Sequence, residues 1–128
     1  MRLATLTTAF ALLAACNQVN PISDEEKIEI DCLSSITVVK ITDAIREGSE
    51  TGVDAAELQK IPAEKIAEAI EILDTKYDGR MDEAFLEYEV NHRLDKIQDA
   101  LNNRDPDSEA NKIMTETLEL GRSCTFGS

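Results

Sequence analysis

The sequence has no tryptophan, and its three phenylalanines and two tyrosines bring the aromatic content to only 4%. A buried core must therefore be built mainly from aliphatic side chains. Low-complexity runs and internal repeats are also lacking, so a repeat architecture is excluded. The length of 128 residues fits one domain, because single cores commonly occupy about 100 to 150 residues.

Basic residues are scarce: 13 Lys and Arg stand against 26 Asp and Glu, which gives a net charge of −13. This balance argues against binding to nucleic acid or to an anionic lipid surface, because neutralising phosphates needs clustered Lys and Arg. The excess of carboxylates fits a self-repelling soluble surface, or one that attracts a basic protein or a cation.

Histidine is almost missing, since His92 is the only one. A di-metal helical bundle needs two Glu-x-x-His motifs, so pairs such as Glu64 with Glu68 indicate a solvated face instead. The widely spaced cysteines do not form a zinc motif, and no serine lies in a nucleophile-elbow context. The sequence therefore predicts neither an enzyme nor a cofactor.

An uncharged, mostly apolar run follows Arg2 at residues 3–15, as in an export signal. The run is too short to span a membrane, which takes about 20 apolar residues. The chain turns polar from Asn17 onward. We therefore expect a signal peptide at residues 1–15, a tether at 16–22 and a helical domain at 23–128.

The run ends in Leu13-Ala14-Ala15-Cys16, which resembles the bacterial lipobox. The resemblance implies cleavage before Cys16 and attachment of a diacylglyceryl group to its thiol. An ordinary secretory signal cleaved near Ala15 is the alternative, although Leu13 fits its small-residue pattern poorly. Because Asn17 replaces the aspartate linked to inner-membrane retention, the resemblance implies the periplasmic face of the outer membrane. Without lipidation the protein would be secreted or periplasmic.

Three cysteines are an odd number for an exported chain. Lipidation of Cys16 leaves Cys32 and Cys124 as one pair in a compartment where disulfides persist. Such a bridge would stabilise the fold by about 4 to 5 kcal/mol through its long loop. Two buried free thiols are the alternative.

The first helix is predicted to start at the capping box Ser23-Asp24-Glu25-Glu26 and to end at Gly48. Residues 34–42 are rich in β-branched side chains and could form a strand, but the cap and the lack of a partner strand favour helix. The positions expected to be buried are Ile28, Cys32, Leu33, Ile36, Val39 and Ile45.

Three further helices and one short turn are predicted. Asp54 caps a turn through Lys60, and Pro62 opens a helix that ends at Asp78-Gly79. The buried face of this helix is expected to contain Ile66, Ile70, Leu73 and Tyr77.

The next helix, about 80–103, carries two apolar stripes and should be covered on two sides, by segment 54–60 or by a partner. One stripe consists of Met81, Ala84, Phe85 and Tyr88, and the other of Leu86, Val90, Leu94, Ile97 and Leu101.

The last helix is expected to begin at Pro106, capped by Asp105, and to end near Cys124, with a frayed tail at 125–128. Its inward positions are predicted to be Ala110, Ile113, Met114, Leu118 and Gly121. Because the connections are short, the sequence predicts an all-α protein: an up-down-up-down four-helix bundle with a short extra helix, closed by one disulfide.

Residues 74–85 resemble an EF-hand calcium loop. The matching positions are Asp74, Asp78, Gly79, Met81 and Asp82. Lys76 and Phe85 depart from the pattern, because each stands where a ligand oxygen is required. The alternative is an Asp-Gly helix cap followed by an acidic first turn.

The sequence therefore favours a small acidic lipoprotein of the cell envelope that binds a protein without catalysis, as an inhibitor or immunity protein does. It would be attached to the membrane through Cys16 and would bind a basic envelope protein. A calcium-responsive module using Asp74, Asp78 and Asp82 is the alternative function.

Overall fold

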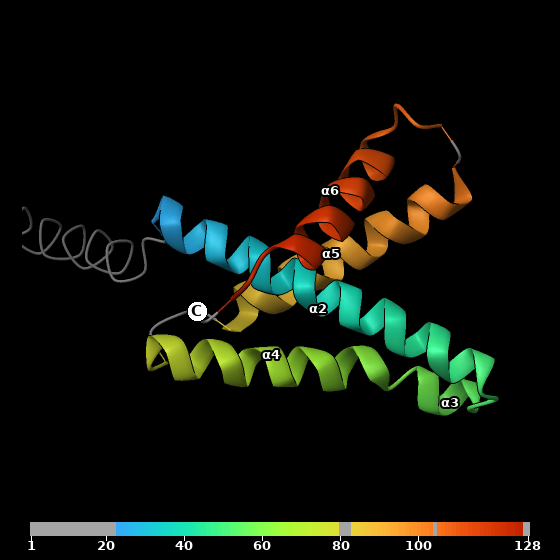
Figure 1. The fold of residues 1–128 in the computed structure, drawn as a ribbon, viewed down its shortest axis with the longest axis horizontal. Helices are drawn as coiled ribbons and strands as arrows, with labels where there is room; N and C mark the ends of the chain where they lie inside the picture. The colour runs from blue at the N-terminus through green and yellow to red at the C-terminus, as the bar shows by residue number, and fades with distance from the viewer. Residues whose placement is uncertain (1–22, 80–82, 104, 127–128) are drawn as a thin grey trace, which may run out of the picture.

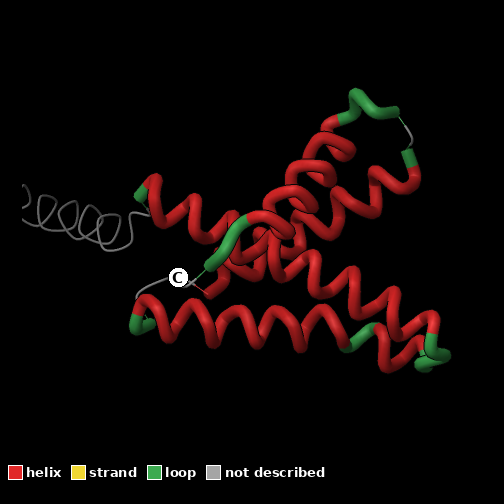
Figure 2. The backbone as a smooth tube through the Cα atoms, in the orientation of Figure 1, coloured by secondary structure: helices red, strands yellow, loops and turns green. Residues whose placement is uncertain are grey.

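The structure is a computed structural model that describes residues 23–79, 83–103 and 105–126. This part of the chain is helical and contains no strand (Figures 1 and 2), which confirms the all-α prediction and the helix at residues 34–42. None of its helices is both long and apolar enough to cross a bilayer. The helices are α2 (Asp24–Glu50), α3 (Ala55–Leu58), α4 (Ile61–Tyr77), α5 (Glu83–Asn102) and α6 (Glu109–Ser123).

Helix α2 lies at the centre and contacts each of the other four. The predicted capping box is present at its start: Ser23 Oγ accepts from the Glu26 amide at 3.1 Å, and the Ser23 amide donates to Glu26 Oε1. The prediction that α2 stops at Gly48 is wrong, because the helix runs on to Glu50. It ends where Gly52 takes the left-handed conformation, with φ of 80°, that glycine tolerates best.

The long helices form two antiparallel pairs that cross one another. Figure 1 shows α4 running back along α2, while α5 and α6 lie side by side and pass obliquely across α2. Four long helices and one disulfide agree with the predicted fold class. The finer up-down-up-down arrangement is not confirmed, because the two pairs do not share one axis.

The core is aliphatic, with Tyr77 as its one buried aromatic residue in the described part. On α4 the predicted face is confirmed: Ile70 packs against the core, and Ile66, Leu73 and Tyr77 are buried. On α2 the face is only partly right, since Ile28 is 67% exposed. The fully buried apolar side chains of α2 are instead Ile30, Val38 and Ile41, beside the correctly predicted Leu33.

Small side chains bring α6 very close to α2. A β-carbon added to Gly121 would lie 2.5 Å from the carbonyl oxygen of Ser35. Ser34 and Ser35 are fully buried at this crossing, and Ser34 Oγ donates to the Ile30 carbonyl of its own helix at 2.6 Å. The Ser34 hydroxyl therefore needs no partner on α6, whereas Ser35 Oγ makes no hydrogen bond within the described residues.

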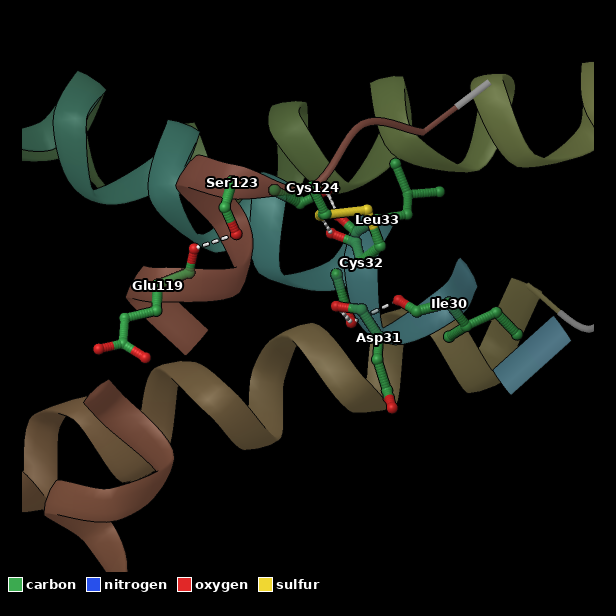
Figure 3. Close-up of a disulfide and its surroundings, with 9 residues drawn as sticks. Ile30, Asp31, Cys32, Leu33, Glu119, Ser123 and Cys124 are labelled. Atoms are coloured by element: carbon green, nitrogen blue, oxygen red, sulfur yellow. Dashed lines mark hydrogen bonds between the residues drawn. A yellow bond between two sulfur atoms is a disulfide. The ribbon is translucent and has the colours of Figure 1, made fainter. Parts of the chain in front are cut away.

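The predicted disulfide is present and ties the end of α6 to α2 (Figure 3). Cys32 lies on α2 and Cys124 is the C-cap of α6, with their Cα atoms 6.0 Å apart and 92 residues between them in sequence. The bridge therefore holds together two elements from opposite ends of the described chain.

Helix α5 follows the prediction on one side only. Leu86 and Val90 are buried, but Leu101 is 68% exposed and Ala100 is buried in its place. Of the other stripe, Phe85 packs partly against the core, Tyr88 is 62% exposed, Ala84 is exposed and Met81 lies outside the described residues. Segment 54–60 was predicted as one element that could cover this stripe. In the structure this segment contains α3, which packs on α2 instead.

Helix α6 starts later than predicted, at Glu109 rather than Pro106. Ser108 Oγ accepts from the Asn111 amide at 3.2 Å and is the cap, while Asp105 Oδ1 accepts from the Asp107 amide within the preceding turn. Only Thr117 of α6 is fully buried. The predicted inward residues are half-buried: Ala110, Ile113, Met114, Leu118 and Gly121.

Candidate functional site

Two adjoining hollows lie beside the disulfide, and we refer to them together as the C-terminal groove. The first has a volume of about 600 Å³ and is lined by Glu68, Glu71, Ile72, Thr75, Lys76 and Phe126. The second, of about 470 Å³, is lined by Ile28, Glu29, Asp31, Cys32, Lys76, Leu120, Cys124, Thr125 and Phe126. Lys76 and Phe126 belong to both hollows and so form the ridge between them.

The ridge is built by two contacts of one ammonium group, that of Lys76. Lys76 Nζ on α4 lies 2.7 Å from Glu29 Oε1 on α2, and 4.7 Å from the centre of the Phe126 ring. Phe126 is placed there because it follows Cys124 by two residues, and it packs partly against the core. The prediction of a frayed tail is therefore wrong for Phe126.

Both apolar side chains and carboxylates line the groove. Ile72 is 40% exposed and Ile28 is 67% exposed, so both offer apolar surface within the groove. Glu68, Glu71, Ile72 and Thr75 share one face of α4, since they are spaced by three and four residues. The arrangement can bind a ligand that is apolar and positively charged.

Sequence reasoning did not find this groove. It placed Ile28 in the core and did not single out Ile72 or Phe126. One signal was available: Ile72 lies off the Ile66, Ile70, Leu73, Tyr77 face and directly follows Glu71.

A second polar cluster joins three helices at Arg93, whose exposure is only 7%. Arg93 Nη1 donates to Thr117 Oγ1 on α6 at 2.9 Å, and Nη2 lies 3.3 Å from Asp31 Oδ1 on α2. Its Nε lies 3.8 Å from Glu89 Oε2 one turn earlier. These contacts link α2, α5 and α6 through a single guanidinium group, whose planar fork can pair with several acceptors at once.

His92 lies next to this cluster. Its ring stacks on Tyr88 with 5.8 Å between ring centres, in keeping with the predicted shared side of the helix. His92 also lines a small hollow of about 260 Å³ together with Lys27, Asp31, Glu89, Arg93, Ile113 and Glu116. The carboxylates of Asp31 and Glu89 both face Arg93.

Replacing Arg93 by methionine is expected to lower the free energy of unfolding by about 2 kcal/mol, because the buried Thr117 hydroxyl and the partly buried Asp31 lose their donor. Urea unfolding measures the change. Arg46→Met is the matched control, since Arg46 forms an exposed ion pair with Asp43. Loss of this pair should lower the free energy of unfolding by less than about 0.5 kcal/mol. Equal stability of the two variants would contradict the role given to Arg93.

The EF-hand-like segment is only partly described. Asp74 lies in the last turn of α4, and its backbone carbonyl accepts from the amides of both Asp78 and Gly79. Asp78 has φ of 54° and Gly79 φ of 74°, so this stretch forms the Asp-Gly cap that was the alternative interpretation. Asp82 lies outside the described residues. Within the described ranges no three His, Cys, Asp or Glu residues are grouped to hold a metal, and calcium binding stays a prediction.

The lipobox Leu13-Ala14-Ala15-Cys16 and the tether also lie outside the described residues. No protein-family model, curated protein or solved structure matches this chain.

Proposed function

We propose that this chain is a small acidic lipoprotein of the bacterial cell envelope, whose mature domain binds another protein without catalysing a reaction. Lipid on Cys16 anchors it at the periplasmic face of the outer membrane. The partner is an envelope protein with a basic surface, such as a hydrolase that this domain inhibits or a toxin that it neutralises.

Support for the envelope location comes from the cysteines. Cys32 and Cys124 are joined in the structure, so Cys16 is the one cysteine outside this bridge. A stable disulfide is typical of proteins in oxidising compartments such as the periplasm. A cysteine outside that bridge, at the end of a run that resembles an export signal, fits the proposed acylation.

The single observation that carries the binding role is the C-terminal groove. Exposed apolar patches and grooves rimmed by polar residues are typical of protein interaction sites on soluble domains. Here Ile28 and Ile72 are exposed within a groove that Glu68 and Glu71 also line. The net charge of −13 would also accelerate the encounter with a basic partner.

The proposal is tested by capturing partners from envelope extract with the lipid-anchored protein and measuring each candidate again in purified form by calorimetry. We expect a stoichiometric complex with a protein of basic surface. Its affinity should fall between about 50 mM and about 500 mM salt, because ions screen surface charges. If no purified envelope protein binds at the lower salt concentration, the binding role is wrong.

A further inference from the structure

We infer that the C-terminal groove binds a basic amphipathic segment of the partner protein, with apolar side chains in the two hollows and Lys or Arg side chains against the α4 carboxylates. This inference rests on the proposed protein-binding function. It adds the place on the domain where binding occurs and the chemistry of the bound segment.

The charges that face the groove favour a cationic occupant. Four carboxylates line it, those of Glu29, Asp31, Glu68 and Glu71, against the single ammonium group of Lys76. Glu29 neutralises Lys76 at 2.7 Å, and Asp31 faces Arg93. The Lys65 contact to Glu68 is long, 3.6 Å, and the Glu68 side chain is 57% exposed, so this pair competes weakly with a ligand.

Glu71 adds a second carboxylate beside Glu68. Within the described residues no ion pair involves Glu71, which is exposed on the same face of α4. A Lys or Arg of the occupant would therefore gain a partner here without displacing an internal one. Anionic lipid headgroups would be repelled by the same two side chains.

The shape of the groove requires two apolar anchors. Ile72 and Phe126 border the first hollow, and Ile28, Leu120 and the disulfide border the second. The Lys76 and Phe126 ridge separates them, so one continuous segment must place an apolar side chain on each side of it. Amphipathic helices that dock into grooves present apolar side chains at such intervals, three or four residues apart.

The groove also lies near the proposed anchor. The first turns of α2, the last turns of α4 and the segment after α6 lie at the same side of the molecule (Figure 1). Ile28 is about 8 Å along α2 from Ser23. Residues 16–22 span at most about 25 Å when fully extended. In the lipid-anchored protein, the bound segment is therefore presented close to the membrane surface.

The test uses a synthetic helical peptide of leucine and lysine with one tryptophan, added to the lipid-anchored mature protein in detergent. Because this chain has no tryptophan, all of the tryptophan fluorescence comes from the peptide. A titration of the peptide into the same detergent without protein measures the signal of micelle-bound peptide, which is subtracted. Methyl NMR of the isoleucines locates the site. We expect shifts at Ile28 and Ile72 and none at the core residue Ile41 or at Ile113 in the other hollow.

Matched variants separate groove binding from general attraction to an acidic surface. Glu71→Gln combined with Ile72→Asn should weaken peptide binding about tenfold, the loss expected from one apolar anchor and one charged contact. Glu109→Gln combined with Leu101→Asn removes an equal charge and an exposed apolar side chain elsewhere, and should change affinity less than about twofold. Equal weakening by both pairs would overturn the inference.

Two further outcomes would also overturn it. One is equal affinity for a scrambled peptide of the same composition, which would show that charge alone decides binding. The other is a shift of the Ile28 and Ile72 signals caused by phosphatidylcholine vesicles without peptide, which would assign the groove to lipid. If a captured partner binds the groove variant as tightly as the unchanged protein, the groove assignment fails while the proposed protein-binding function stands.

Discussion

Replacing Gly121 by alanine is expected to lower the free energy of unfolding by roughly 3 kcal/mol, although alanine is the better helix former. The added β-carbon would lie 2.5 Å from the Ser35 carbonyl oxygen and 2.6 Å from Val39 Cγ2. The first of these atoms belongs to the backbone of a fully buried turn, so it cannot move aside. Helix α6 would have to retreat from α2 and lose packing along their whole contact.

Urea unfolding of the oxidised protein measures this change, and Gly48→Ala is the matched control. The β-carbon at Gly48 would lie 2.6 Å from Leu58 Cδ2, the end of a half-buried side chain that can rotate away. Gly48 lies within α2, so alanine there should leave stability unchanged or raise it by about 0.5 to 1 kcal/mol. Two variants of equal stability would contradict the close crossing of α2 and α6.

Removing the disulfide by Cys32→Ser combined with Cys124→Ser is expected to have the largest effect, a loss of about 4 to 5 kcal/mol. The bridge closes a loop of 92 residues, so its loss restores much conformational freedom to the unfolded chain. Helix α6 should loosen first, because Thr117 is its only fully buried residue. Urea unfolding gives the free energy, and hydrogen exchange shows where protection is lost.

Cys16→Ser is the control for this experiment, since it removes the one cysteine that lies outside the bridge, together with the lipid proposed on it. Its domain stability should equal that of the unchanged protein. A double serine variant within about 1 kcal/mol of the unchanged protein would show that the disulfide contributes little to the fold.

Patterns within short stretches of the sequence were sufficient to predict α4 and the start of α2, and the number of cysteines was sufficient to predict the disulfide. Pro62 and the spacing from Ile66 to Tyr77 give the second long helix its beginning and its buried face. The capping box at Ser23 depends only on residues within one turn. The pairing of Cys32 with Cys124 was predicted because three cysteines, less the one assigned to lipid, leave a single pair.

Of the buried residues of α2, only Cys32 and Leu33 were predicted, because the prediction of a single apolar stripe assumes that one side of the helix is covered. Helices α4, α5 and α6 all pack on α2, so Ser34, Ser35 and Thr37 are buried while Ile28 is exposed. No pattern in one segment shows that another helix approaches closely enough to need small residues.

The candidate site was not predicted either, because it also depends on contacts between different helices. The C-terminal groove exists because Cys124 is tied to α2, which holds Phe126 beside Lys76. Arg93 is buried because its partners come from two other helices. These contacts join residues far apart in sequence, and propensity or periodicity describes only neighbours.

The mass of the intact protein, purified from its native membrane without reduction, tests the central claim most directly. We expect a chain that begins at Cys16, carries the mass of a lipid group on that residue, and is two daltons lighter than the reduced form because of the Cys32 to Cys124 bridge. A chain with an unmodified Cys16, or one that retains residues 1–15, would contradict the proposal of a lipid-anchored envelope protein.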